Sequence, residues 1–274
     1  MLLAALCPGS GVHAGNDRQL VALINDLRQS STGCGGRPVE PVAPLAPDER
    51  LARVRVASEA QLQAALRQAG YRAAKVQVIA VSGPRDAATA LRAIKQRYCR
   101  ELLSAQFAEI GVLRLANSWQ VVLARPLSFA SLGDWQAVGR AVLAQVNQAR
   151  AAPRRCGERA FTAAPALTWD ARLAKAALLH SRDMAEHDYF SHRGRDGSYA
   201  DLRATRQGYR WRRIGENLAA GQNSVEQVVA GWLSSPEHCA NIMNPRFTEM
   251  GAAYVLNPKS SGGSYWAQLF GTPR

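Results

Sequence analysis

Four segments of the chain space their apolar residues three or four positions apart, the pattern of a helix with one buried face. The predicted helices are residues 17–29, about 134–150, 171 to about 187, and 225–233. Asp170 and Ser224 stand directly before the last two segments. Their side-chain oxygens can accept hydrogen bonds from the first N–H groups of a helix, so we expect these two helices to begin just after them.

Five shorter apolar runs predict strands. They are Val76–Val81, Ile110–Leu115, Gln120–Leu123, Met250–Val255 and Tyr265–Phe270. Asn117 and Ser118 separate two of them, and a loop of residues 258–263 separates the last pair, so both pairs are expected to form hairpins. Helices combined with antiparallel strands indicate an α+β layered fold.

The chain also resembles itself, which is best tested before other patterns. Asn25, Cys34 and Leu51 recur 122 positions later as Asn147, Cys156 and Leu173. Gly70-Tyr71-Arg72 recurs 138 positions later, and Cys99, Phe107, Glu109 and Gly111 recur 140 positions later. The offset grows by 138 − 122 = 16, so the first copy lacks sixteen residues between Leu51 and Leu62. We therefore interpret residues 15–132 and 133–274 as one unit present twice, with the first copy reduced.

The repeat also bears on the cysteines. Of the five cysteines among 274 residues, Cys7 lies near the N-terminus and four occupy equivalent places in the two copies. This selects Cys34–Cys99 and Cys156–Cys239 from the three possible pairings. The alternative is four buried free thiols. Disulfides would place the protein in an oxidising compartment.

The N-terminus is similar to a short export signal. Leu2–Leu6 is apolar, and Val12 and Ala14 supply small residues before Gly15, so residues 1–14 are predicted to be a signal peptide, possibly truncated. No run of eighteen apolar residues predicts a transmembrane helix. We expect a periplasmic or secreted protein.

The net charge of +13 raises the question of nucleic acid. The basic residues form no tail and no long block, and the densest cluster, Arg203–Arg213, is interrupted. Charge spread in this way favours a solvated basic surface, with weak attraction to anionic lipids or cell-wall polymers, so no nucleic-acid partner is expected.

Several short motifs follow one another in the second copy. They are Leu167–Asp170, His180–Met184, Tyr189–His192, Gly215–Ala219, Ser235–His238, Asn241–Met243, Phe247–Gly251 and Tyr265–Gln268. In this order they resemble the bacterial branch of the CAP superfamily, which includes cysteine-rich secretory proteins, antigen 5 and plant pathogenesis-related proteins. The resemblance implies an α-β-α sandwich, present twice with the first copy reduced, and a groove that holds histidine and glutamate side chains.

The resemblance places His192 and Glu216 in that groove. The positions of the second glutamate and second histidine of eukaryotic members hold Ser235 and Arg246 here, and His238 matches a histidine typical of the bacterial branch. His192, Glu216 and His238 are therefore the candidate catalytic residues, and His192 and His238 the possible metal ligands. Imidazole nitrogen can bind zinc, and a carboxylate can act as ligand or general base.

Each candidate also has a structural interpretation. His192 and Glu216 can form a hydrogen-bonded pair that anchors the groove, and His238 can be a polar partner beside the disulfide. His180 lies on an apolar helix stripe, which favours a core histidine, and His187 is about 10 Å further along that helix. Glu249 recurs as Glu109 in the first copy, which favours a structural role.

The two copies differ where the groove should be. Gln77-Val78 stands near the place of Glu216 and Asn217, and Tyr98 replaces His238, while the cysteines are kept. Gly-x-Ser-x-Gly and phosphate-loop motifs are absent. These observations favour an exported, non-enzymatic module that binds a small apolar ligand, a lipid, or a cell-envelope or protein partner. The alternative is a metal-assisted hydrolase or protease that uses the same residues.

Overall fold

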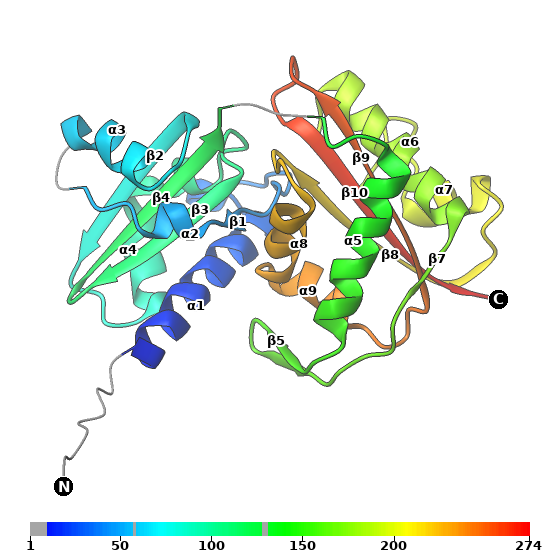
Figure 1. Cartoon of the computed structure of the whole chain (residues 1–274), viewed down its shortest axis with the longest axis horizontal. Helices are drawn as coiled ribbons and strands as arrows, with labels where there is room; N and C mark the ends of the chain where they lie inside the picture. Colours follow the sequence, from blue (N-terminus) through cyan, green and yellow to red (C-terminus); the bar gives the residue numbers. More distant parts are fainter. Residues whose placement is uncertain (1–9, 57–58, 128–130) are drawn as a thin grey trace, which may run out of the picture.

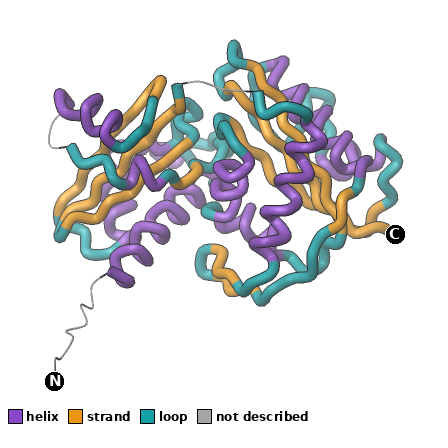
Figure 2. The backbone as a smooth tube through the Cα atoms, in the orientation of Figure 1, coloured by secondary structure: helices purple, strands orange, loops and turns teal. Residues whose placement is uncertain are grey.

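The computed structural model describes residues 10–56, 59–127 and 131–274, and only the backbone of residues 10–16. Of the predicted signal peptide, residues 1–9 lie outside the described residues, so its cleavage stays a prediction. Figure 1 shows two layered halves, each built on one four-stranded sheet, and Figure 2 shows helices placed against both sheets. The fold is therefore of the mixed α+β class, as predicted.

The N-terminal half has a sheet of strand order β1-β3-β4-β2, in which β1 runs parallel to β3 and the other neighbours are antiparallel. Its elements are α1 (Ser10–Gln29), the 3₁₀ turn η1 (Cys34–Gly36), β1 (Ala46–Pro47), α2 (Glu49–Ala52), α3 (Glu59–Gln68), β2 (Ala73–Ser82), α4 (Ala87–Leu102), β3 (Glu109–Leu115) and β4 (Ser118–Pro126).

The C-terminal half has a sheet of strand order β7-β9-β10-β8, again with one parallel edge pair. Its elements are α5 (Trp135–Arg150), β5 (Arg154–Cys156), β6 (Arg159–Phe161), β7 (Thr168–Trp169), α6 (Ala171–His187), α7 (Ala200–Arg206), β8 (Trp211–Ala220), α8 (Val225–Leu233), α9 (Pro236–Met243), β9 (Glu249–Asn257) and β10 (Gly263–Pro273).

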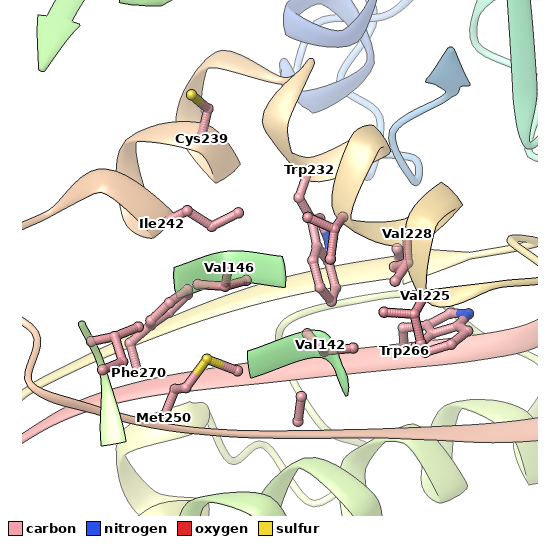
Figure 3. Close-up of a cluster of buried hydrophobic side chains, with 14 of the residues drawn as sticks. Val142, Val146, Val225, Val228, Trp232, Cys239, Ile242, Met250, Trp266 and Phe270 are labelled. Carbon is pink, nitrogen blue, oxygen red and sulfur yellow. The ribbon is translucent and has the colours of Figure 1, made fainter. Parts of the chain in front are cut away.

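Helices α5 and α6 cover opposite faces of the second sheet, which gives it three layers (Figure 1). The α5 face buries Val142 and Val146 against Trp266 and Phe270 (Figure 3). On the α6 side, a Cβ atom at Gly251 would lie 2.0 Å from the backbone nitrogen of Ala174. Glycine at this position is what lets the helix lie so close to β9.

The two sheets agree in detail. Ala46 pairs with Glu109 in the first sheet, and Thr168 pairs with Glu249 in the second. The indole nitrogens of Trp119 and Trp266 donate to a backbone oxygen in the loop after the antiparallel edge strand, that of Pro84 after β2 at 3.0 Å and that of Gln222 after β8 at 3.1 Å. The halves differ between the parallel edge strand and the antiparallel edge strand, where seventeen-residue α6 has only four-residue α2 as its counterpart in chain order.

Both predicted disulfides are present, Cys34–Cys99 and Cys156–Cys239, and this excludes four free thiols. They close loops with sequence separations of 65 and 83 residues, and loops of this length give about 4 kcal/mol each on the chain-entropy model. Among the described residues, no helix has the length and apolarity needed to cross a membrane.

The halves meet where α8 packs on β1. The buried amide of Gln222 donates to the carbonyl oxygens of Pro44 and Ala108, at 3.0 and 3.3 Å. Asn25 donates to the hydroxyl of Ser234 at 2.9 Å. The four buried apolar clusters each lie within one half, so the contact between the halves is carried by small and polar groups.

Candidate functional site

The three candidate residues come from different elements of the C-terminal half. His192 lies in the loop after α6, Glu216 in β8, and His238 in the first turn of α9. The loop is positioned by His180 of α6, whose Nε2 lies 2.9 Å from the carbonyl oxygen of Ser191. His180 is 1% exposed, and burial lowers its pKa, so the ring is neutral and Nε2 carries the hydrogen. The predicted core histidine thus holds the segment that carries His192.

His192 and Glu216 form a hydrogen-bonded pair, with 2.8 Å between Nδ1 and Oε1. The second carboxylate oxygen, Oε2, accepts a hydrogen bond from Arg203 at 2.6 Å. Burial alone would raise the pKa of Glu216, but the hydrogen bond from His192 and the charge of Arg203 outweigh it and hold the pKa below its ordinary value. Glu216 is therefore ionised, and both of its oxygens are engaged.

Arg203 also fixes the backbone around the pair. Its guanidinium donates to the carbonyl oxygens of His192 at 3.1 Å and of Ser198 at 2.7 Å. The side chain of His192 is 42% exposed, whereas that of Glu216 is 4% exposed. Because Nδ1 of His192 donates to Glu216, the remaining ring nitrogen, Nε2, is the polar atom that this pair presents to a ligand.

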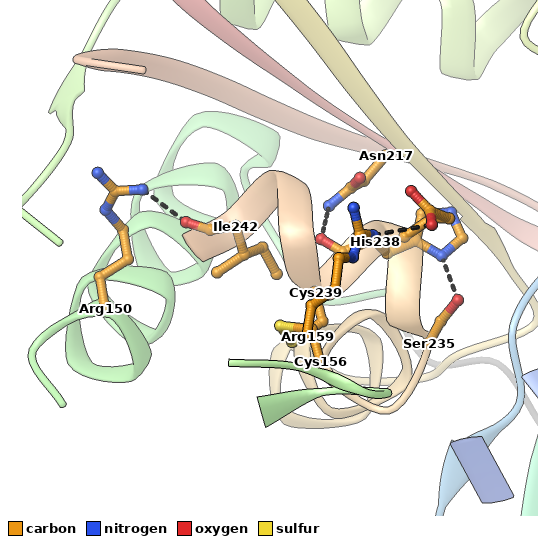
Figure 4. Close-up of a disulfide and its surroundings, with 9 residues drawn as sticks. Arg150, Cys156, Arg159, Asn217, Ser235, His238, Cys239 and Ile242 are labelled. Atoms are coloured by element: carbon orange, nitrogen blue, oxygen red, sulfur yellow. Dashed lines mark hydrogen bonds and ion pairs between the residues drawn. A yellow bond between two sulfur atoms is a disulfide. The ribbon is translucent and has the colours of Figure 1, made fainter. Parts of the chain in front are cut away.

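His238 lies nearly buried beside the disulfide, with Nδ1 2.8 Å from the hydroxyl oxygen of Ser235 (Figure 4). Burial, with a smaller contribution from the charge of His192, lowers the pKa of His238 to about 3. The ring is therefore neutral at physiological pH. Ser235, which the resemblance aligns with the second glutamate of eukaryotic members, is the hydrogen-bond partner of His238.

Amide side chains join β8 to its neighbours. Asn217 donates to the carbonyl oxygen of His238 and to Gln268, both at 3.1 Å. Asn241 donates to the side-chain oxygen of Asn217 at 2.9 Å and to the backbone oxygen of Glu216 at 3.3 Å. This network fixes the position of Glu216 relative to α9 and β10.

The donor set does not fit a zinc site with three protein ligands. Within residues 10–56, 59–127 and 131–274, no group of three His, Cys, Asp or Glu side chains is placed to hold a metal ion. The oxygens of Glu216 are occupied by His192 and Arg203, and one nitrogen of each groove histidine is already engaged. His187, at the end of α6, pairs with Asp183.

The sequence did not predict the part played by Arg203. It belongs to the basic cluster that was interpreted as a solvated surface, yet it is 7% exposed and pairs with Glu216. The other arginines of that cluster are exposed. An arginine five residues before the Gly208-Tyr209 pair gives no sequence signal of burial, because its partner lies thirteen residues away on another element.

One known family matches most of the C-terminal half. The model of the CAP, or cysteine-rich secretory protein, family matches residues 143–270. Residues 143–270 therefore form a CAP domain. Glu249 of this CAP domain accepts a hydrogen bond from Tyr209 at 2.6 Å, and Glu109 accepts one from Tyr71 in the other half.

Similar proteins match part of the chain. Uncharacterized protein YkwD of Bacillus subtilis is 39% identical over 102 residues, which is 37% of this chain and 37% of that protein. Uncharacterized membrane protein YlbC of the same organism is 36% identical over 86 residues, 31% of this chain and 25% of that protein. The chain thus spans well under half of the length of either relative.

Among solved structures, an extracellular SCP-domain protein from Bacillus anthracis is 21% identical, with a TM-score of 0.43 over 60% of this chain and 59% of that one. A cysteine-rich secretory protein from Staphylococcus aureus is 13% identical, with a TM-score of 0.40 over 56% and 50% of the two chains.

Proposed function

We propose that the CAP domain is an extracytoplasmic binding module. Its groove, walled by His192, Glu216 and His238, takes the polar group of a small ligand, a lipid or a cell-envelope component without chemical turnover. The observation that carries this proposal is the engagement of both Glu216 oxygens, by His192 at 2.8 Å and by Arg203 at 2.6 Å. A carboxylate held in this way orients an imidazole, and each of its oxygens already has a protein partner, which favours a positioning role over that of a general base or metal ligand.

The chemistry of the pair indicates what it binds. When the His192 ring is neutral and its Nδ1–H donates to the ionised glutamate, Nε2 carries a lone pair that can accept a hydrogen bond. The neutral ring of His238 adds no charge to the groove. A hydroxyl or ammonium donor on the ligand therefore suits this groove better than an anionic group.

The export and the repeat are parts of the same proposal. Two disulfides support a periplasmic or secreted location, because such bonds persist in oxidising compartments. The matching strand order of the two sheets supports one unit present twice. In the first sheet Val78 pairs with Val122, and in the second Glu216 pairs with Leu269, so an apolar residue stands at the site of the groove glutamate. The first copy then acts as a scaffold without a groove.

Co-sedimentation tests the proposal. The oxidised protein is mixed separately with phosphatidylglycerol-containing vesicles and with purified cell-wall sacculi, each beside His192→Ala and the matched exposed variant His187→Ala. We expect one of the two materials to retain wild type and His187→Ala and to lose His192→Ala. Equal retention of all three proteins would contradict binding through the groove.

A zinc titration by calorimetry separates this proposal from metal-assisted hydrolysis. Wild type and the double variant His192→Ala/His238→Ala are titrated side by side. We expect no micromolar binding by either protein. Micromolar binding by wild type that the double variant loses would overturn the proposal and favour the hydrolase.

A further inference from the structure

A hollow in the CAP domain lies between α6, the loop of residues 194–198, and α7, with a volume of about 320 Å³. Helix α6 contributes one wall, and the loop and α7 contribute the other. None of His192, Glu216 and His238 lines it, so the hollow is distinct from the groove. Arg203, which lines the hollow, is the one residue that also contacts the groove pair.

The wall formed by α6 is apolar at Ala176 and Leu179. Leu179 is 38% exposed, and two apolar side chains that do not line the hollow, Tyr199 directly before α7 and Leu202 within it, are 55% and 44% exposed. These are three of the six large apolar side chains that the described part of the chain exposes. An apolar wall with a few polar groups beside it is typical of a hollow where a small ligand binds.

Two hydrogen-bond acceptors stand beside this apolar wall. His180 and Asp183 are three residues apart on α6 and therefore lie on one face of the helix. Nε2 of His180 donates to Ser191, which makes Nδ1 an acceptor, and Nδ1 has no hydrogen-bond partner among the described residues. The ring is 1% exposed and still lines the hollow. Asp183 accepts a hydrogen bond from the hydroxyl of Tyr189 and contacts His187. Among the described residues it pairs with no arginine or lysine.

The positive charge comes from the opposite wall. Arg206 pairs with Asp196, and Arg203 pairs with Glu216. Arg195 lines the hollow and has no carboxylate partner within the described part of the chain. The hollow thus combines an arginine without a carboxylate partner, Arg195, two hydrogen-bond acceptors, Asp183 and Nδ1 of His180, and an apolar wall.

We propose that this hollow binds a small zwitterion with an apolar side chain, an α-amino acid or a dipeptide. The ligand carboxylate meets Arg195, its ammonium group meets Asp183 and Nδ1 of His180, and its side chain lies on Ala176 and Leu179. Both ion pairs are charge-assisted hydrogen bonds, which are the strong ones. The proposal does not depend on the groove, because Arg195 and Asp183 do not contact His192.

Calorimetry with L-leucine and leucyl-leucine tests it on the full oxidised chain. Leucinamide lacks the carboxylate and 4-methylpentanoate lacks the ammonium group, so each removes one predicted contact. We expect a saturable heat from leucine or leucyl-leucine, weakened about tenfold or more in each of these two analogues. No saturable binding of leucine or leucyl-leucine at millimolar concentration would overturn the proposal. Equal binding of 4-methylpentanoate would also overturn it, since apolar contact alone would then suffice.

Variants locate the site. Arg195→Gln and Asp183→Asn are each expected to weaken the affinity for leucine at least tenfold. Arg182 is an exposed arginine of α6 outside the hollow, so Arg182→Gln should leave that affinity unchanged. Thermal melting confirms that each variant is folded. His192→Ala should keep full leucine binding, so failure of the groove and failure of this site give different results. Unchanged affinity in both Arg195→Gln and Asp183→Asn would contradict the proposed site.

Discussion

Tyr71 donates a hydrogen bond from its phenol to Oε2 of Glu109, a carboxyl group with no exposed surface. The other oxygen, Oε1, is buried without a hydrogen-bond partner. Burial raises the pKa of Glu109 from 4.5 to about 7, although the hydrogen bond from Tyr71 opposes the shift. The N-terminal half therefore carries a buried acid that titrates near neutral pH.

The substitution Glu109→Gln should remove a pH dependence of stability. Because the folded pKa is raised, the contribution of Glu109 is fully present below pH 4.5 and is lost as the pH rises through 7. The difference amounts to roughly 3 kcal/mol. We expect the wild-type N-terminal half to lose stability between these pH values and Glu109→Gln to lose far less. Chemical denaturation followed at several pH values measures both curves.

Glu249→Gln is the matched control, because Glu249 accepts the equivalent hydrogen bond from Tyr209 in a half-buried place. Glu249→Gln should leave the pH-dependent loss of stability of the N-terminal half as it is in wild type. If Glu109→Gln keeps the wild-type pH dependence, another group is responsible for it.

His238 should give the CAP domain the opposite pH dependence. Its folded pKa of about 3 lies below the ordinary value of 6.5, so its contribution is present above pH 6.5 and is lost as the pH falls toward 3. The full effect is several kcal/mol. His238→Asn keeps a hydrogen-bonding group near Ser235 and cannot take up this proton. We expect the free energy of unfolding of His238→Asn to fall less steeply between pH 6.5 and pH 3 than that of wild type or of the exposed variant His187→Asn. An unchanged pH dependence in His238→Asn would contradict the assignment to His238.

Arg203→Met should destabilise the CAP domain through Glu216. The substitution leaves a buried carboxylate without its cation, and breaking such a pair typically costs about 3–5 kcal/mol. Adding Glu216→Gln removes the uncompensated charge, so the double variant should recover a large part of that loss. Equilibrium denaturation of the two single variants and the double variant measures the coupling. If the losses of the two single variants simply add in the double variant, the Arg203–Glu216 pair is not the cause of the destabilisation.

The sequence predicted most elements in which periodicity and a capping residue agree. Helix α6 begins directly after Asp170, whose carboxylate accepts from the backbone nitrogens of Arg172 and Leu173 at 2.8 and 3.1 Å. Helix α8 begins after Ser224, which accepts from Gln227 at 3.2 Å. Such signals are local, so the chain itself displays them.

Strand β8 was not predicted, although it carries Glu216. Its segment, residues 211–220, contains adjacent arginines and the Gly215-Glu216-Asn217 run, which hides any alternation of apolar residues. The polar side chains are accommodated by long-range partners, as when Asn217 bonds to His238 and Gln268. A functional strand of this kind breaks the local pattern because tertiary contacts satisfy its polar groups.

Residues 133–274 should fold without the N-terminal half. The apolar clusters around α5 and α6 draw all their fully buried residues from this part of the chain, and so does the Cys156–Cys239 bridge. Removing the first half exposes Gln222 to water, which can replace the carbonyls of Pro44 and Ala108. We expect the fragment to show a cooperative thermal transition and dispersed amide resonances in NMR spectra. An unfolded fragment would mean that the α8–β1 contact is needed to complete the CAP domain.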